Sequence, residues 1–315
     1  MTQTFSRRRA LQLMGVAAVL PFSRAWAADG DALTFLAVGD WGRDGADRQS
    51  EVAEQMGLTA RAVRARFVIS VGDNFYEKGV ESATDPKWKT SFEDVYAAPS
   101  LQVPWYVALG NHDYYGTPEA QLDYAKTSPR WRMPRRYYSR RETAPDGSSL
   151  ELFVLDTTPL IPDYLAHKGL APKLAGLDPD GQVAWFAAAL AASTADWKVV
   201  VGHHPIWAGD NSESGKEGHW GSPDLVAKLD PLLKRHGVHL YLNGHDHELQ
   251  HTVRGANHYV CTGAGSQMEP FCDTVGADFC SLQSGFIACS VSRQTLRVAY
   301  RDWQGNELRV VDIPA

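Results

Sequence analysis

The sequence predicts an α/β fold, with an α/β core joined to a more antiparallel half. Apolar strand-like runs alternate with helix-spaced segments early in the chain, whereas such runs follow one another directly near its C-terminus. Most early runs are continuously apolar, which is typical of strands covered on both faces. The expected strands are 34–40, 67–73, 105–113, 152–158, 197–205, 239–247, 258–265, 285–292 and 295–303.

Helices are expected at 46–65, 180–192 and 223–236. The first has apolar residues at helical spacing, and the last has a proline in its first turn and Gly237 just beyond its end. The segment 127–149 is rich in Arg, Tyr and Pro, and we expect it to be a surface loop or insertion. Because the chain has no internal repeat and no low-complexity linker, we expect one domain.

The N-terminal residues 1–27 have the layout of an export signal. The stretch SRRRALQLMGVAAVLPFSRAWA contains three adjacent arginines, an apolar core and a small-residue end, AWA. Its apolar part is shorter than the roughly 20 residues that a membrane span needs. The order SRRRAL resembles a twin-arginine signal, and an Arg-rich general secretory signal is the alternative. We therefore expect a single mature domain over 28–315, located in the periplasm or outside the cell.

The mature chain is acidic. Without residues 1–27 it has 27 Lys and Arg against 37 Asp and Glu, a formal net charge of −10. Such a balance disfavours non-specific binding to nucleic acids or anionic membranes. No remaining stretch is long and apolar enough to span a bilayer, so we expect neither a nucleic-acid partner nor a membrane span.

The four cysteines, Cys261, Cys272, Cys280 and Cys289, lie in one window near the C-terminus. They allow three connectivities, and an exported protein favours disulfides over free thiols. We expect a nested arrangement, with Cys272–Cys280 inside Cys261–Cys289. A zinc site is the alternative, although the spacings contain no CxxC pair.

Most of the expected strands end in a glycine followed by polar residues. The clusters are GD (39–40), GDNFY (72–76), GNHD (110–113), GHHP (202–205) and GHDH (244–247). Glycine allows a sharp turn at a strand end, and the carboxyl ends of strands are where open α/β sheets bind ligands. One such cluster would be ordinary turn chemistry, but five together point to a shared site.

The donors in these clusters are carboxylate and amide oxygens and imidazole nitrogens, with no thiolate. This set suits iron, manganese or zinc. Six or seven donors are too many for one tetrahedral zinc but fit two metals that share a bridging carboxylate. The sequence therefore predicts a dinuclear metal centre.

The series GD–GDNFY–GNHD–GHH–GHDH, spread over most of the mature chain, resembles the calcineurin-like metallophosphoesterases. Tyr76 narrows the resemblance to the purple acid phosphatases of the small tartrate-resistant type. The resemblance implies a four-layer α/β/β/α sandwich with two mixed sheets. It also implies an exported acid phosphatase that hydrolyses phosphomonoesters by attack of metal-bound hydroxide.

Two other functions stay open at this point. The same scaffold could cleave phosphodiesters or act as a nucleotide pyrophosphatase or nucleotidase, with 206–222 and 127–149 setting the preference. A catalytically inactive fold, kept for phosphate binding or protein contact, would be expected to have gaps in the donor set, and the sequence has none.

The resemblance also implies metal ligands. Asp40, Tyr76 and His247 would bind one metal, Asn111, His203 and His245 the other, and Asp73 would bridge them. A phenol becomes a good ligand only where a strongly polarising ion removes its proton, so the first metal is expected to be Fe(III). The second is expected to be divalent Fe, Zn or Mn.

For catalysis the resemblance implies that His112 contacts the substrate and helps protonate the leaving group. Asp113 would hold that imidazole in orientation and keep it charged. A second substrate histidine is expected in AGDNSESGKEGHWG, where His219 is our choice although Ser212 lies nearer the usual spacing. His204 and His251 are expected to support the ligands or the fold, and His258 is given no role.

Overall fold

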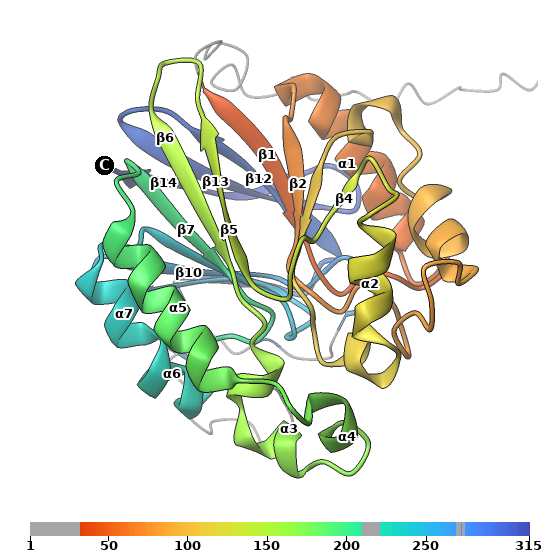
Figure 1. Ribbon diagram of the computed structural model, residues 1–315. Helices are drawn as coiled ribbons and strands as arrows, with labels where there is room; N and C mark the ends of the chain where they lie inside the picture. The colour runs from red at the N-terminus through yellow and green to blue at the C-terminus, as the bar shows by residue number, and fades with distance from the viewer. Residues whose placement is uncertain (1–31, 210–220, 269–271, 273–274) are drawn as a thin grey trace, which may run out of the picture.

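Two seven-stranded mixed sheets form the centre of the part of the chain that the computed structural model describes, residues 32–209, 221–268, 272 and 275–315. The expected signal, 1–27, lies outside these residues. The sheets pack face to face, and helices cover their outer faces (Figure 1). This is the α/β sandwich with two mixed sheets that the resemblance implied.

The first sheet has the strand order β14-β13-β12-β1-β2-β3-β4. Neighbours from β1 to β4 are parallel, and neighbours from β1 through β12 to β14 are antiparallel. Its strands are β1 (Leu33–Val38), β2 (Phe67–Ser70), β3 (Trp105–Val107), β4 (Trp131–Arg132), β12 (Gly285–Val291), β13 (Thr295–Asp302) and β14 (Glu307–Pro314).

The second sheet has the order β11-β9-β10-β8-β7-β6-β5. Its central strands β6, β7, β8 and β10 are parallel, and antiparallel strands flank them on both sides. Its strands are β5 (Tyr138–Thr143), β6 (Ser149–Val154), β7 (Trp197–Val201), β8 (Leu240–Asn243), β9 (Leu249–Arg254), β10 (Asn257–Thr262) and β11 (Phe279–Ser281). Most antiparallel pairs involve the C-terminal strands β9 to β14, as expected, and these strands are divided between the two sheets.

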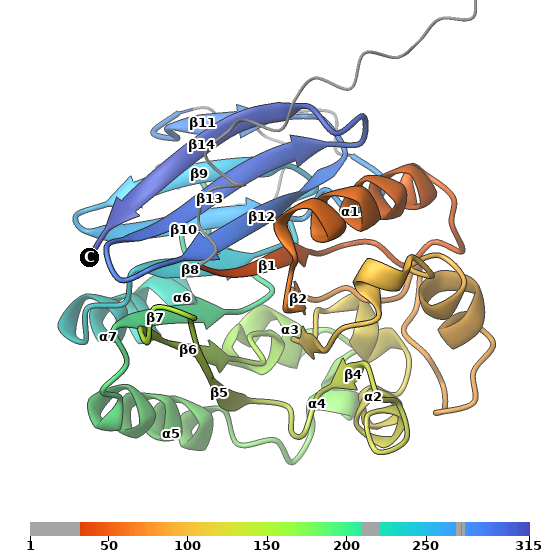
Figure 2. The ribbon, with the colours of Figure 1, turned by 90° about the horizontal axis from the view of Figure 1, so that it is seen from above.

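Figure 2 shows α1 and α5 on opposite sides of the sandwich. The expected apolar positions of α1 are buried, and α5 covers the second sheet through Phe186 and Leu190. The α-helices are α1 (Gln49–Val63), α2 (Pro118–Tyr124), α3 (Pro162–Ala166), α4 (Ala171–Leu174), α5 (Pro179–Ala192), α6 (Pro223–Lys228) and α7 (Asp230–Arg235). The chain also has a short π-helix, η1 (Trp88–Glu93), and three 3₁₀-helices, η2 (Pro99–Leu101), η3 (His112–Tyr115) and η4 (Thr158–Leu160). None of the helices in the described residues is long and apolar enough to cross a membrane.

Two sequence expectations about elements were wrong. The single helix expected over 223–236 is divided into α6 and α7 at Leu229, because Pro231 has no amide hydrogen and disfavours a continuous helix at this point. The segment 127–149 contains β4 and the edge strand β5 rather than a loop alone. Most side chains of β5 are exposed, so the strand has none of the apolar alternation that reveals strands in sequences.

The cysteines form one disulfide, Cys272–Cys280, as expected for the inner pair. The expected outer pair is wrong, because Cys261 and Cys289 are free and buried. Cys261 lies in β10 of the second sheet and Cys289 in β12 of the first, so the two strands that flank the disulfide loop belong to different sheets. Burial raises the pKa of both thiols, which keeps them protonated and unreactive.

Candidate metal centre

The C-terminal ends of β1, β2, β3, β7 and β8 meet at one edge of the two sheets, and the predicted donors follow these ends. The phenol oxygen of Tyr76 lies 2.9 Å from Asp40 Oδ1, 3.0 Å from Asp73 Oδ2 and 2.9 Å from His247 Nε2. These four residues come from three strand ends far apart in the sequence. The structure therefore brings together the set that was expected around the first metal and its bridge.

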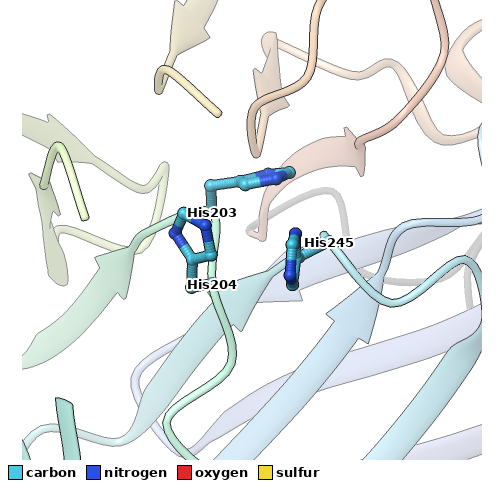
Figure 3. A group of neighbouring side chains, drawn as sticks. All are labelled: His203, His204 and His245. Carbon is cyan, nitrogen blue, oxygen red and sulfur yellow. The ribbon is translucent and has the colours of Figure 1, made fainter. Parts of the chain in front are cut away.

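A second group adjoins the first through Asp73. His203 Nε2 lies 3.2 Å from Asn111 Oδ1 and 3.4 Å from Asp73 Oδ2. The ring of His245 lies with its centroid 5.1 Å from that of His203 and 4.5 Å from that of His204, and Figure 3 shows the three imidazoles gathered together. All seven residues expected as ligands thus lie in one cluster, with Asp73 between its halves.

The backbone at the strand ends is shaped to present these side chains. Asp40, Asp73 and His245 adopt left-handed φ angles of 59°, 47° and 71°, which turn the chain sharply after each strand. The neighbouring glycines allow close approach between strand ends. A Cβ atom on Gly110 would lie 2.2 Å from Asp73 Oδ1, and one on Gly244 would lie 2.2 Å from Asp40 Oδ2.

Buried charge dominates the electrostatics of the cluster. Burial raises the pKa of Asp73, but His203 and His112 outweigh it and hold that pKa below its usual range. Burial lowers the pKa of His203, whereas Asp73 and Asp40 raise it to about 9. Burial and the same two carboxylates raise the pKa of the Tyr76 phenol well above its ordinary value.

The donor set fits metal cations. The oxygen of Tyr76 contacts two carboxylates and an imidazole but carries one proton, so it can donate only one of these three hydrogen bonds. Buried carboxylates of this kind need a positive partner, and a metal ion supplies one that several oxygens share. Asp40, Asp73 and His203 also have ligand atoms that lie within 4.8 Å of one another.

His112 lies at the wall of the centre, on η3. Its backbone amide donates to Asp73 Oδ1 at 2.7 Å, and its ring Nδ1 contacts the carbonyl of Glu77 at 2.8 Å. The expected partner of this ring, Asp113, does not contact it. The carbonyl of Glu77 is therefore what orients the imidazole.

Asp113 is buried and has a different task from the one expected. Its carboxylate accepts hydrogen bonds from the amides of Gly110 at 2.8 Å and Asn74 at 3.1 Å and from Gln121 Nε2 at 2.8 Å. It therefore joins the loop after β2 to the loop after β3. The prediction was wrong because adjacency in sequence placed Asp113 beside His112, while the turn of η3 directs its side chain inward.

His204 supports the site, as expected, through residues that the sequence analysis did not single out. Its Nδ1 lies 2.8 Å from Thr157 Oγ1 and its Nε2 lies 2.9 Å from the hydroxyl of Tyr164. The same Thr157 oxygen accepts from the backbone amides of His203 and His204 at 3.2 and 3.1 Å. Thr157 follows β6, so its position at a strand end could have drawn attention to it.

Three other histidines were considered in the sequence: His251, His258 and His219. His251 Nε2 and His258 Nδ1 contact each other at 2.9 Å on β9 and β10, where the pair belongs to the fold rather than to the metal cluster. His219 and Ser212 fall outside the described residues, so the second substrate histidine stays a prediction.

A cavity of about 480 Å³ opens at the cluster. Besides five expected ligands and His112, its lining contains four residues that the sequence did not reveal: Arg43, Glu77, Tyr164 and Gln267. Arg43 and Glu77 closely follow Asp40 and Tyr76, so proximity to the motifs was the available clue. Tyr164 on α3 and Gln267 beyond β10 had none.

The calcineurin-like phosphoesterase family model matches residues 33–249. Purple acid phosphatase 4 of Arabidopsis thaliana is 36% identical over 295 residues, which cover 89% of this chain and 83% of the relative. Human tartrate-resistant acid phosphatase type 5 is 38% identical, with 76% of this chain and 74% of the relative covered.

Solved structures share the fold. GAP50, described as the anchor in the inner membrane complex of Plasmodium, has a TM-score of 0.75 and 25% identity, covering 90% of this chain and 89% of its own. Purple acid phosphatase PPD1 from yellow lupin seeds has a TM-score of 0.65 and 16% identity, covering 90% of this chain and 54% of its own.

Proposed function

The chain belongs to the purple acid phosphatases of the calcineurin-like phosphoesterase family, and on this premise we propose an exported acid phosphatase that hydrolyses phosphomonoesters at a dinuclear metal centre. The observation that carries the proposal is the contact of the Tyr76 phenol with Asp40, Asp73 and His247. Export rests on residues 1–27, and the disulfide Cys272–Cys280 supports an oxidising compartment.

The proposed ligands are those expected from the sequence: Asp40, Tyr76 and His247 for one metal, Asn111, His203 and His245 for the other, and Asp73 for both. Burial and two carboxylates disfavour ionisation of Tyr76, so a phenolate here requires a strongly polarising ion such as Fe(III). A divalent Fe, Zn or Mn ion suits the His and Asn donors. When bound, the cations would supply Lewis acidity, which polarises phosphoryl oxygens and lowers the pKa of water so that hydroxide is available as the nucleophile.

His112 is the proposed proton donor to the leaving group. Its Nδ1 is held by the Glu77 carbonyl, so Nε2 is the ring nitrogen available to a substrate in the cavity. A hydrogen bond from Nδ1–H to that carbonyl fixes both the ring orientation and the position of the transferable proton. His219 is proposed as a second donor to the phosphoryl group.

Two alternatives can be separated from this proposal. A diesterase or nucleotide pyrophosphatase on the same scaffold would hydrolyse a phosphodiester faster than the corresponding monoester, which a comparison of the two rates decides. The GAP50 structure is described as an anchor, so this fold does not by itself select an enzyme. The complete cluster of seven donors is what favours catalysis over a purely structural role.

The test is the visible spectrum and metal content of the purified, exported protein. Iron together with a broad absorption band that is lost in Tyr76→Phe would support a phenolate ligand to Fe(III). A colourless protein that holds zinc or manganese alone would remove the iron assignment and favour the diesterase or nucleotidase alternative. His247→Asn should also alter the band, whereas a band unchanged in both variants would contradict the assigned ligands.

A further inference from the structure

Arg43 lies over the ring of Tyr76 at the wall of the cavity. Its guanidinium carbon is 3.9 Å from the centre of the phenol ring, and its side chain is only 10% exposed. Arg43 Nε donates to Ser266 Oγ at 3.2 Å, and its backbone amide donates to Gln49 Oε1 at 3.0 Å. The guanidinium is therefore held in place from several sides rather than free to reach across the cavity.

Arg43 also pairs with Glu77, the residue that follows Tyr76, whose carboxylate accepts from Arg43 Nη1. The carbonyl of this same residue contacts the ring of His112. Lys87 Nζ donates to the carbonyls of Tyr76 at 3.1 Å and Lys78 at 2.6 Å. One short turn thus carries the phenol, the ionic partner of Arg43 and the group that orients His112.

We propose that Arg43 is a positioning residue for the metal centre, which stabilises negative charge on the Tyr76 phenol and, through Glu77, fixes the turn that orients His112. A cation over an aromatic face is attracted to the ring, and the attraction grows when the ring carries negative charge and solvent is excluded. The inference rests on the proposed function, because it assumes that Tyr76 is a ligand and His112 a proton donor.

The competing role for Arg43 is direct contact with the substrate phosphate, since arginine commonly binds phosphate. Its contacts argue against that role. The guanidinium already donates to Ser266 and Glu77 and lies over the Tyr76 ring, so reaching a phosphate would break these contacts. The two roles predict different responses to inorganic phosphate, a competitive probe for the substrate.

The experiment compares the exported, metal-loaded protein with its Arg43→Met variant, which keeps an unbranched side chain but removes the guanidinium and its charge. We expect the visible band to move to longer wavelength, because a phenolate without its cation transfers charge to the metal at lower energy. We also expect kcat to fall about tenfold, while Ki for inorganic phosphate stays within about twofold. Arg43→Lys, which restores the charge without the guanidinium that bonds both Ser266 and Glu77, should recover part of both effects.

Glu77→Gln is the complementary variant, which is expected to shift the band in the opposite direction. Its side chain is 71% exposed, so the variant should fold, and the amide oxygen can still accept from Arg43. Removing the negative charge leaves the guanidinium less neutralised over the phenol, so the band should move to shorter wavelength, opposite to Arg43→Met. Should Arg43→Met fail to fold or lose metal, this shift decides, and an unmoved band in Glu77→Gln would overturn the proposal.

Other results also decide. An unmoved band with a several-fold higher Ki for phosphate would make Arg43 a substrate contact and overturn the positioning role. A colourless wild-type protein would contradict Fe(III) and leave kcat and Ki, measured with the metal that it does hold, to decide. A tenfold lower kcat with unchanged Ki would then support positioning through Glu77 and His112, and an unchanged kcat would overturn it.

Discussion

The two sheets contribute different chemistry to the same centre. The strand ends of the first sheet provide every oxygen donor of the proposed set: Asp40, Asp73, Tyr76 and Asn111. The strand ends of the second sheet provide every nitrogen donor: His203, His245 and His247. The close contacts Tyr76–His247 and Asn111–His203 both cross from one sheet to the other. The centre is therefore complete only when the sheets are packed together.

In each sheet a further side chain forms hydrogen bonds that hold the loops carrying the donors. On the first sheet Asp113 joins the two loops that carry Asp73 and Asn111, and on the second Thr157 holds the backbone amides of His203 and His204. Because metal ions would bind residues of both sheets in the folded state only, they should stabilise the packed pair. The difference between the sheets therefore leads us to expect that the proposed metals link the two sheets as well as serve the reaction.

The largest effect is expected for Asp73, because its carboxylate contacts residues of both sheets. Asp73→Asn removes the carboxylate proposed to bridge the cations, so we expect both metals to be lost and activity to fall by at least about 10³-fold. Metal analysis and phosphomonoester turnover would measure this. Asp123→Asn is the control, since that aspartate is exposed on α2 and pairs with Lys126. An Asp73→Asn protein that retained both metals would contradict the bridge.

Substitution of His112 is expected to slow the reaction without loss of the metals proposed to link the sheets. His112→Asn removes the proposed proton donor but none of the proposed ligands, so metal content should be unchanged while kcat falls by about 10²–10⁴-fold. Metal analysis with steady-state kinetics on a phosphomonoester gives both quantities. His236→Asn, after the end of α7, is the matched control and should leave both unchanged. Loss of metal in His112→Asn would make His112 part of the metal-binding cluster instead.

Asp113→Asn tests the corrected role of this carboxylate. An asparagine can place its NH2 group against the amides that Asp113 now accepts from, so at least one buried hydrogen bond should be lost. We expect the free energy of unfolding to fall by about 2–4 kcal/mol, measured by urea unfolding of the metal-loaded protein. At temperatures where it is folded, its kcat should fall less than that of His112→Asn. Equal losses of kcat with unchanged stability would restore the original interpretation, that Asp113 orients His112.

The sequence was sufficient for the parts of the molecule that obey local rules. Strands such as β1 and β7 are covered on both faces and therefore read as apolar runs, and a glycine followed by polar residues marks their ends. All seven proposed ligands follow such ends, which is why their gathering could be predicted. Edge strand β5 is mostly exposed, and β9 contains both polar and apolar residues, so neither has that pattern and neither was predicted.

The remaining failures concern contacts between residues distant in sequence. Cys261 and Cys289 flank one loop in the sequence but belong to different sheets, and spacing alone cannot reveal which sheet a strand joins. The partner of His112 proved to be a carbonyl 35 residues away rather than the adjacent aspartate. Likewise Arg43 and Tyr164 reach the cavity from a loop and a short helix, where no periodic pattern exists.

The prediction with the smallest expected effect concerns the second sheet alone, where two groups of histidines have different surroundings. His203, His245 and His247 lie at strand ends in the centre, whereas His251 and His258 pair within the sheet. Burial and the neighbouring His258 lower the pKa of His251 to about 4, with Arg309 acting in the same direction and Asp278 opposing it. The unfolded chain, whose histidines have pKa values near 6.5, therefore binds protons below that pH that the folded chain does not.

The stability that neutral His251 provides is thus present above pH 6.5 and is lost as the pH falls toward 4. We expect the loss of stability between pH 7 and pH 4 to amount to about 2–3 kcal/mol. Urea unfolding of metal-loaded wild-type and His251→Gln proteins from pH 7 to pH 4 would measure it, since the variant should lose less stability over this interval. His236→Asn should follow the wild-type profile. Parallel profiles for wild type and His251→Gln would contradict the assignment, and acid sensitivity would then have to originate in the carboxylates and imidazoles of the metal centre.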